Sequence, residues 1–328
     1  MSVVLVTGGA GYIGSHAVKT LRAARHEVVV LDDLSAGHRA AIGDAPLVEA
    51  DIRDTETVRD TLRRHRVEAV MHFAALLDVG ESVREPGRYY DCNVRGALSV
   101  LDAMVAEGVG RFVLSSTCAV YGQPDEVPLH EDLPTAPINA YGETKLAVER
   151  ALQHYHVAHG LRSVALRYFN AAGADPDGAI GEDHSPEIHL IPRAIDAALG
   201  GRALSLFGTD YPTPDGTCQR DYIHVSDLAS GHLRALETLS EQAAPRVYNL
   251  GTGRPHSVLE VIGAVERVTG RTVPHEVAPR RPGDPAVLFA QAGRVRDELG
   301  WMPRFTALDD IVATAWRWHE SHPDGYAG

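Results

Sequence analysis

The sequence has few cysteines and few basic residues. Its 328 residues include only three cysteines, at Cys92, Cys118 and Cys218, an odd number without the spacing of a zinc site. We therefore expect free thiols in a reducing compartment, the cytoplasm, and no metal site. The 31 lysines and arginines stand against 44 acidic residues, and the formal net charge is −13 at pH 7. This balance argues against a nucleic-acid partner and against a basic membrane-surface protein.

Long apolar runs are also missing. No stretch approaches the ~20 residues that a membrane-spanning helix needs, so we expect no membrane partner. The first residues already have the pattern of a core strand without a basic region before it, so we expect no signal peptide. Hydrophobic residues make up 44% of the chain and charged residues 23%, which is typical of a globular protein with a large core. The length suggests about two domains.

The chain opens with a short apolar run and a glycine-rich turn. Residues 3–6 predict a buried strand, and apolar residues at helical spacing follow Gly14. Gly8 and Gly11 allow the turn and let a pyrophosphate approach the unpaired N–H groups at a helix N-terminus, and Gly14 is expected to let the helix lie against the strand. Their spacing, Gly-x-x-Gly-x-x-Gly, differs from the dehydrogenase fingerprint Gly-x-Gly-x-x-Gly. The pattern predicts a dinucleotide site, and the alternative is an ordinary tight strand–helix connection.

Acidic residues end the second predicted strand, residues 28–31. Asp32 and Asp33 lie ~20 residues past the glycines, where a carboxylate accepts hydrogen bonds from the adenosine ribose. A carboxylate would repel a ribose phosphate, so the cofactor predicted is NAD rather than NADP. The alternative is that both residues belong to a turn. Asp51 and Ile52 end a further short strand that is expected to face the adenine.

Three more buried strands complete the pattern of an α/β fold. They are predicted over 69–75, over 111–116 and over a segment that ends at 168–170. We expect a doubly wound parallel Rossmann sheet with a smaller C-terminal α/β substrate domain. The predicted boundaries are 1–173 for the NAD-binding domain, with 220–240 returning to it, and 174–328 for the nucleotide-sugar domain. In particular, we expect a strand at 222–225 and a helix at 226–238 to lie in the larger domain.

Tyr141 and Lys145 are four residues apart on a predicted helix and therefore share one face. A lysine ammonium stabilises a phenolate and lowers the tyrosine pKa, which makes the pair a general base for an alcohol. Thr117 follows a strand end, and its hydroxyl is expected in the same crevice. A Tyr-x-x-x-Lys pair alone is common on helix surfaces, but here it follows a dinucleotide turn.

Together these motifs resemble the extended short-chain dehydrogenase/reductase family and, within it, the UDP-glucose 4-epimerase family. The resemblance covers nearly the whole chain. The segments that carry it are TGGAGYIGSH, HFAA, YYDCNV, YGETK, LRYFNAAGA, RDYIHVSDLA, YNLGTG and APRRPGD.

The resemblance implies a bound NAD and a UDP-hexose substrate. UDP-glucose and UDP-galactose would interconvert by oxidation at C4, turning of the 4-keto sugar and hydride return to its other face. Tyr141 would take the proton, Thr117 would hydrogen-bond the reacting oxygen, and Lys145 would hold the nicotinamide ribose. The expected cofactor-binding residues are Gly8, Gly11, Tyr12, Ile13, Gly14, Asp32, Asp33, Asp51, Ile52, Phe73, Ala74, Ala75, Tyr141, Lys145, Tyr168 and Phe169.

The resemblance also implies a set of substrate contacts. Besides Thr117 and Tyr141, the expected residues are Asn170, His189, Leu190, Arg220, Arg281, Asp284 and Leu288. The two arginines occupy positions that clamp the UDP phosphates, for which the planar guanidinium is suited. Asp284 is expected to accept the uridine ribose hydroxyls.

Three positions depart from the family pattern. Leu77 replaces a lysine near the cofactor and Cys92 replaces an asparagine, and both changes predict weaker NAD retention. Leu288 replaces a bulky tyrosine of some members, which leaves room for UDP-N-acetylhexosamines.

Other members of the fold fit less well. Sugar-nucleotide dehydratases need an Asp-Glu pair where this chain has Cys118 and Ala119, and decarboxylating relatives need a glutamate there. Two alternatives remain open, a UDP-glucuronate 4-epimerase and a non-catalytic NAD-sensing regulator. The family forms dimers through two helices per subunit, so we expect a homodimer through the helices at 93–107 and 141–158.

Overall fold

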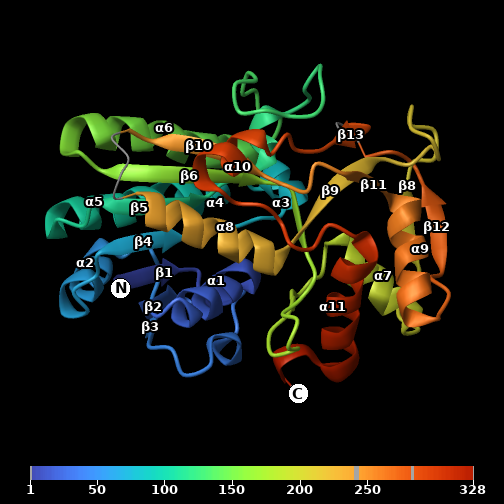
Figure 1. The fold of residues 1–328 in the computed structure, drawn as a ribbon, viewed down its shortest axis with the longest axis horizontal. Coiled ribbons are helices and arrows are strands. Elements are labelled where there is room, and N and C mark those ends of the chain that lie inside the picture. Colours follow the sequence, from blue (N-terminus) through green and yellow to red (C-terminus); the bar gives the residue numbers. More distant parts are fainter. Residues whose placement is uncertain (1, 240–243, 282–283, 328) are drawn as a thin grey trace.

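The computed structural model describes residues 2–239, 244–281 and 284–327. A central parallel sheet with helices on both faces continues at one end into a smaller part (Figure 1). The sheet order is β10-β6-β5-β4-β1-β2-β3, and all pairs are parallel. Its strands are β1 (Val3–Thr7), β2 (Glu27–Asp32), β3 (Leu47–Glu49), β4 (Ala69–His72), β5 (Arg111–Ser115), β6 (Arg162–Tyr168) and β10 (Arg246–Leu250). Because the order reverses between β1 and β4, the predicted doubly wound fold is confirmed.

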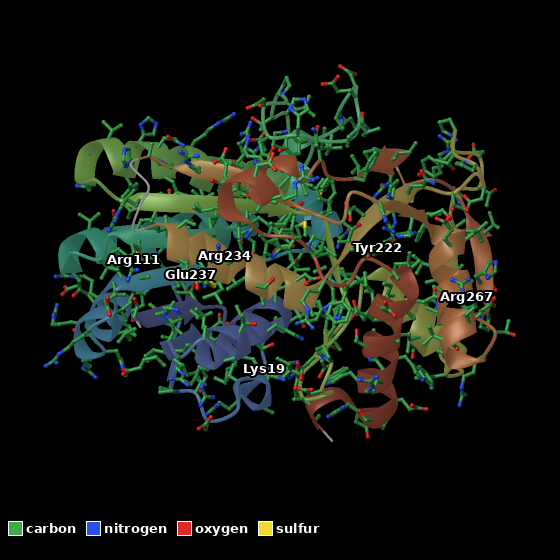
Figure 2. The ribbon with its side chains drawn as sticks, in the orientation of Figure 1. Lys19, Arg111, Tyr222, Arg234, Glu237 and Arg267 are labelled. Carbon is green, nitrogen blue, oxygen red and sulfur yellow. The ribbon has the colours of Figure 1, made fainter. Side chains whose placement is uncertain are left out.

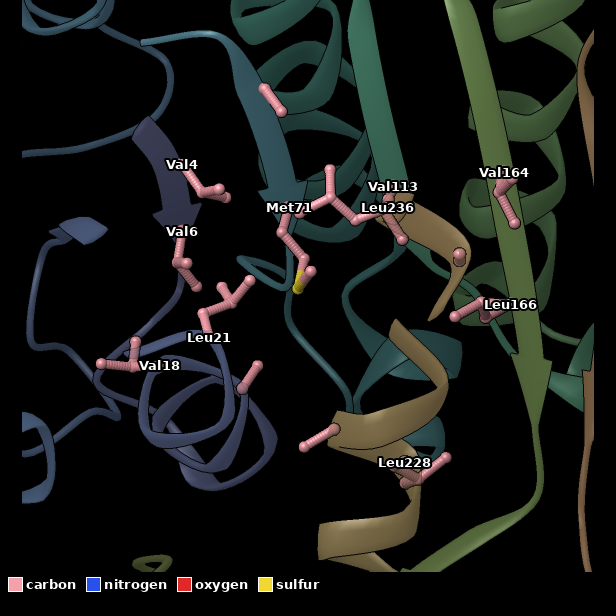
Figure 3. Close-up of a cluster of buried hydrophobic side chains, with 14 of the residues drawn as sticks. Val4, Val6, Val18, Leu21, Met71, Val113, Val164, Leu166, Leu228 and Leu236 are labelled. Atoms are coloured by element: carbon pink, nitrogen blue, oxygen red, sulfur yellow. The ribbon is translucent and has the colours of Figure 1, made fainter. Parts of the chain in front are cut away.

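Amphipathic helices cover the two faces of this sheet. One face carries α1 (Tyr12–Ala23) and α8 (Val225–Thr238), and the other carries α2 (Thr55–Arg64), α5 (Gly96–Glu107) and α6 (Ala140–His159). Lys19 of α1 and Arg234 of α8 lie on the outer side of their helices, with partly exposed side chains (Figure 2). The inner sides pack on apolar strand residues, as Figure 3 shows for Val4, Val6, Val18, Leu21, Met71, Leu228 and Leu236. Burial of these side chains on both faces explains the continuous apolar runs of the strands.

The smaller part has its own sheets and its own core. A four-stranded sheet has the order β11-β9-β13, with β7 also paired to β9, and a two-stranded sheet joins β12 to β8. These strands are β7 (Asn170–Ala172), β8 (Leu204–Phe207), β9 (Gln219–His224), β11 (Pro255–Ser257), β12 (His275–Ala278) and β13 (Val287–Leu288). The helices α7 (Leu190–Ala198), α9 (Val258–Thr269) and α11 (Leu308–Ser321) enclose a separate apolar cluster.

The chain passes between the two parts differently from the prediction. The strand expected at 222–225 is β9, and it pairs with β11, β13 and β7 of the smaller part and not with the large sheet. Its side chains reach both cores, Tyr222 that of the smaller part and Ile223 that of the large sheet. The helix that follows, α8, does lie on the large sheet, and β10 then adds an outer strand beside β6 that was not predicted. Ser240, the end of the predicted segment 220–240, lies outside the described residues.

The remaining elements are short. They are η1 (Arg39–Ile42), α3 (Val79–Arg84), α4 (Pro86–Tyr89), the π-helical turn η2 (Tyr90–Arg95), η3 (Cys118–Tyr121), α10 (Gly293–Leu299) and η4 (Gly325–Ala327). The helix predicted over 93–107 therefore begins within a π-helical turn before α5. Within the described ranges, no helix combines the length and the apolar character needed to cross a bilayer.

Candidate active site

The glycine turn lies at the carboxyl edge of the sheet, between β1 and β4. Gly8 has a φ of +69°, and a Cβ on it would lie 2.4 Å from the Ala74 backbone nitrogen. The loops after β1 and β4 therefore touch through their backbones. This is the point where the strand order reverses, and doubly wound sheets bind their ligands there.

Gly11 and Gly14 shape the start of α1. Gly11 is the N-cap residue and offers no side-chain hydrogen bond to the first turn, which also contains no acidic residue. The N–H groups and the positive dipole end are thus available to an anion. A Cβ on Gly14 would lie 2.1 Å from the Gly8 carbonyl oxygen. Gly14 is therefore required by the turn itself, whereas the sequence pattern suggested that it serves helix–strand packing.

We expect Gly14→Ala to weaken NAD binding by about 10–100-fold, because the new methyl group must displace the turn that faces the phosphates. The affinity is measured by titration calorimetry on protein stripped of nucleotide, with circular dichroism as a check on folding. The matched control is Gly293→Ala, whose Cβ would meet nothing within 4 Å. An unchanged NAD affinity in folded Gly14→Ala would contradict the role of this turn.

Asp32 and Asp33 follow β2 as expected, but their oxygens already have backbone partners. Asp32 is 7% exposed and accepts hydrogen bonds from the N–H groups of Ala10 and Leu34, each at 2.9 Å. Exposed Asp33 accepts hydrogen bonds from the N–H and hydroxyl of Ser35. Each carboxylate oxygen can accept more than one hydrogen bond. Asp32 therefore ties the glycine turn to the end of β2 and keeps acceptor capacity beside it.

Some of the predicted cofactor residues already form hydrogen bonds or ion pairs with other residues of the chain. The Tyr12 hydroxyl donates to the Gly173 carbonyl at 2.6 Å, and Asp51 is ion-paired with Arg53. The Tyr168 hydroxyl lies 2.8 Å from the Ser115 Oγ. Of the remaining predicted residues, Ile13 packs on the core beneath α1, and Ile52 is buried beside α5. The centre of the Phe73 ring lies 4.7 Å from that of the His232 ring, and Ala74 and Ala75 follow in the same loop after β4. Phe169 is buried in the same apolar cluster as Leu146.

The three predicted catalytic residues meet at the same edge. Tyr141 and Lys145 are in the first turns of α6, which Asn139 caps by accepting a hydrogen bond from the Gly142 N–H. The Lys145 ammonium donates to the Ser115 carbonyl at 2.9 Å and lies 6.0 Å from the centre of the Tyr141 ring. Thr117, 7% exposed, follows β5. The edge thus presents a phenol, a hydroxyl and an ammonium within a largely buried setting.

Burial dominates the electrostatics of this group. It raises the pKa of Tyr141 above its usual range; the nearby Tyr168 adds to the shift, and a hydrogen bond with Thr117 opposes it. Burial also lowers the pKa of Lys145 to about 8. In the protein alone, the Tyr141 pKa is therefore raised, which is opposite in direction to the lowering by Lys145 that the sequence analysis expected. A further positive charge at this edge would be needed to make the phenol acidic.

Asn93 is a site residue that the sequence analysis missed. It is 2% exposed, its Oδ1 accepts from the Leu76 N–H at 2.8 Å, and its amide donates to the Leu76 carbonyl and the Thr144 hydroxyl. It therefore fixes the loop after β4 against α6. The π-helical turn aims it there, and such turns are frequent at functional sites. No local pattern in YYDCNV distinguishes this asparagine from a surface one.

The two departures near the cofactor edge differ in exposure. Leu77 is 41% exposed, while Cys92 is partly buried in the turn before Asn93, and burial raises the pKa of its thiol.

The predicted substrate residues lie mainly in the smaller part. Asn170 of β7 is paired with Tyr222 of β9, and Leu190 begins α7. Arg220 of β9 forms an ion pair with Asp284 and lies opposite Leu288 of β13. The other predicted arginine, Arg281, is exposed and stacks over Phe207, with 4.0 Å between its Cζ and the ring centre. Pro282 and Gly283, in the same APRRPGD segment, lie outside the described residues. His189 joins a cluster of charged side chains described below.

Known proteins resemble this chain over nearly its whole length. The UDP-glucose 4-epimerase of Halalkalibacterium halodurans is 49% identical over 325 residues, which are 99% of this chain and 97% of that protein. The crystal structure of UDP-glucose 4-epimerase from Brucella ovis in complex with NAD is 48% identical, with a TM-score of 0.94 over 96% of this chain and 98% of that one. The Bifidobacterium longum enzyme in complex with NAD+ and UDP is 38% identical, with a TM-score of 0.93 over 99% of this chain and 100% of that one.

The family match agrees with these likenesses. Residues 4–251, more than half of the chain, match the NAD dependent epimerase/dehydratase family. They include the glycine turn, Thr117 and the Tyr141–Lys145 pair. The chain therefore belongs to the NAD dependent epimerase/dehydratase family.

Proposed function

We propose that this protein interconverts UDP-glucose and UDP-galactose. The observation that carries the proposal is the meeting of Tyr141, Thr117 and Lys145 beside the glycine turn, in a chain about half identical to proteins named UDP-glucose 4-epimerase. The comparisons do not favour a UDP-glucuronate 4-epimerase or an NAD sensor.

The residues at the sheet edge suit NAD. The N-terminus of α1 offers unpaired N–H groups to a pyrophosphate. Asp32 offers acceptor oxygens to the ribose hydroxyls, and the hydrogen bonds that it already accepts come from backbone N–H groups and not from a basic side chain that could bind a ribose phosphate. Bound NAD supplies a reversible hydride acceptor with a positive ring. That charge is what buried Tyr141 lacks in the protein alone, and it would favour the phenolate.

We assign the proton transfer to Tyr141 and Thr117. Tyr141 takes the proton of the sugar 4-hydroxyl while a hydride passes from the sugar C4 to bound NAD. After the 4-keto sugar has turned, Tyr141 returns the proton to the oxygen as the hydride returns to the other face of C4. Thr117 hydrogen-bonds the reacting oxygen. Lys145 lies between Tyr141 and the end of β5, where its charge favours the phenolate and its ammonium can hold the nicotinamide ribose.

We assign UDP binding to the smaller part, with the large sheet binding NAD. A sugar that must present both faces cannot be held tightly, so the binding energy has to come from the nucleotide. Arg281 is exposed and free to meet a diphosphate, and Arg220 is 15% exposed in its ion pair with Asp284. In this assignment, Arg220 orients Asp284 toward the uridine ribose and shares its remaining donors with the phosphates.

The proposal is tested by incubating the protein with UDP-glucose, with and without added NAD, and resolving the UDP-hexoses. We expect UDP-galactose in both cases if NAD is retained, and only with added NAD if Leu77 and Cys92 weaken its binding. Folded protein that makes no UDP-galactose even with NAD would overturn the proposal. UDP-glucuronate and the N-acetyl sugars are assayed in parallel.

We further propose that UDP-N-acetylglucosamine is a substrate, because Leu288, which packs against the apolar cluster that contains Phe169, is smaller than the tyrosine of some family members. Leu288→Tyr is then expected to lower kcat/KM for this sugar by about 10-fold or more and to spare UDP-glucose. The control is Val287→Ala on the same strand. No turnover of UDP-N-acetylglucosamine by the wild type would refute the wider specificity.

We propose a cytoplasmic homodimer. The helices expected at the contact, 93–107 and 141–158, correspond largely to α5 and α6, which lie against each other. Val157 of α6 is 85% exposed, and burial of so exposed an apolar side chain against a second copy would be favourable. Sedimentation equilibrium should give the dimer mass for the wild type and the monomer mass for Val157→Glu.

A further inference from the structure

The segment between β7 and α7 lies between the two parts of the molecule. Lys19 of α1 pairs with Asp175 at 2.6 Å, and Figure 2 labels this lysine on the face of α1 that meets the segment. Gly181 packs against Trp318 of α11, where a Cβ would lie 2.2 Å from the indole. The segment is therefore held from both sides (Figure 1).

Four side chains of this segment converge on one point. They belong to Glu182, His184, Glu187 and His189, and their potential ligand atoms all lie within 4.8 Å of one another. The Glu182 Oε1 is 2.6 Å from the His189 Nδ1 and 3.2 Å from the His184 Nδ1. The Glu187 oxygens lie 3.2 Å from the His189 Nδ1 and 3.7 Å from the His184 Nδ1.

The hydrogen bonding of this cluster is incomplete. The Glu182 Oε1 and the His184 Nδ1 are fully buried, and neither makes a hydrogen bond, although they are only 3.2 Å apart. The Glu187 Oε1, by contrast, accepts hydrogen bonds from the N–H groups of Ile188 and His189, each at 2.7 Å. A buried polar atom without a partner is unfavourable, and native proteins usually provide such atoms with a protein group, a water or an ion.

The charges of the cluster also call for a cation. Glu182 is 3% exposed and Glu187 is partly buried, so two carboxylates share a poorly solvated space. Lys19, the nearby ammonium, is engaged by Asp175 and Asp177. Two carboxylates together with two imidazoles form a donor set that suits one divalent cation.

We propose that Glu182, His184, Glu187 and His189 bind a divalent transition metal, with zinc as the best match. Imidazole nitrogens with carboxylate oxygens are zinc ligands, and bonds of about 2.0–2.2 Å give a tetrahedron whose ligand atoms lie about 3.3 Å apart. The four separations between glutamate oxygens and histidine nitrogens, 2.6–3.7 Å, bracket that value, and all potential ligand atoms lie within 4.8 Å of one another. In the sequence the four ligands have the spacing Glu-x-His-x-x-Glu-x-His. This proposal differs from our prediction of no metal site, because that prediction considered only the cysteines.

The metal would have a structural role. The site shares no residue with Tyr141, Thr117 or Lys145. Its last ligand, His189, directly precedes α7, and as a metal ligand it would not be the substrate contact that the family resemblance implied. A metal here would fix the path of the chain from β7 to α7 between α1 and α11. Its binding free energy would add to the free energy of unfolding of the holoprotein. This inference does not depend on the proposed epimerase reaction.

The test uses full-length protein without an affinity tag, stripped with EDTA and then titrated with Zn²⁺. We expect one zinc per chain by elemental analysis, a higher Tm with zinc, and the visible absorption of a tetrahedral site when Co²⁺ is used. His184→Ala and Glu182→Gln should each weaken zinc binding by about 100-fold or more, because even outer partners of a metal ligand are worth 10–100-fold. The matched control is His130→Ala, which removes a histidine 3.6 Å from Glu126 outside the cluster.

Two results would overturn the proposal. One is wild-type protein that takes up no zinc and shows no tetrahedral Co²⁺ spectrum, which would leave the cluster as an ion network of protonated histidines. The other is folded His184→Ala and Glu182→Gln proteins that bind zinc as tightly as the wild type. If one of the variants does not fold, the wild-type stoichiometry and spectrum still decide the matter.

Discussion

Replacing Tyr141 with phenylalanine is expected to lower kcat for UDP-glucose by about 10³-fold, because general acid–base catalysis by a positioned group contributes roughly 10²–10⁴-fold. Phenylalanine keeps the ring in its buried setting and removes only the hydroxyl. The KM should change little, since the sugar is to be held through its nucleotide. The rate is measured by resolving UDP-galactose from UDP-glucose over time with saturating NAD.

Tyr155→Phe is the matched control for this substitution. Tyr155 is on the same helix, α6, and its hydroxyl donates to Asp102 on the protein surface. The Tyr155→Phe variant should retain the wild-type kcat. A Tyr141→Phe protein that binds NAD normally and keeps more than about a tenth of the wild-type rate would show that another group moves the proton.

Acid is expected to destabilise the protein steeply below about pH 6.5. Burial lowers the pKa of His16 and His232 to about 4 and that of His72 and His224 to about 3. These rings stay neutral in the folded protein and become protonated in the unfolded chain near pH 6.5. The unfolded state therefore binds more protons as the pH falls. Each histidine should lower the free energy of unfolding by about 1.4 kcal/mol per pH unit, and all four by about 5 kcal/mol per pH unit around pH 5.

The charged histidines act with the opposite sign. The pKa values of His184 and His189 are raised to about 9 and about 10, so their stabilisation is complete below pH 6.5 and is lost as the pH rises through those values. Stability should consequently be greatest near neutral pH. Urea unfolding is followed by circular dichroism at pH 7, 6 and 5 in EDTA, which keeps metal out of the comparison.

A single substitution separates this mechanism from general acid denaturation. His232 is buried, and its Nδ1 lies 2.8 Å from the Leu228 carbonyl, a bond that an asparagine amide can replace. His232→Asn should reduce the pH slope by one proton, about 1.4 kcal/mol per pH unit. His154→Asn, at an exposed position of α6, should leave the slope unchanged. Equal slopes in both variants would rule out His232 as a source of the acid sensitivity.

Much of the site's framework follows from local patterns in the chain. The run at residues 3–6, the glycines after it and the acidic end of the second strand each carry their own structural preference. Strand, turn and helix propensities act over a few residues, so these elements are visible without tertiary information. The Tyr141–Lys145 pair is equally local, because helical spacing alone brings the two side chains to one face.

Other features depend on contacts between distant segments. β9 has the sequence pattern of a buried strand, but only its pairing with β7, β11 and β13 decides which sheet it joins. The ion pair of Arg220 with Asp284 joins residues 64 positions apart, and the Asn93 amide reaches Thr144 across 51 positions. The family resemblance predicted phosphate and ribose contacts for Arg220 and Asp284, but not that they pair with each other.

By itself, the sequence determined the doubly wound class, the dinucleotide turn and the identity of the candidate proton-transfer residues, because each rests on short-range spacing. The tertiary structure decided where the chain crosses between the two parts and which polar groups are already engaged. It also decided the protonation tendencies of Tyr141 and Lys145 and the convergence of Glu182 with His189. Those properties depend on burial and on partners brought together by folding, since desolvation and Coulomb interactions are set by the surroundings of a group in space.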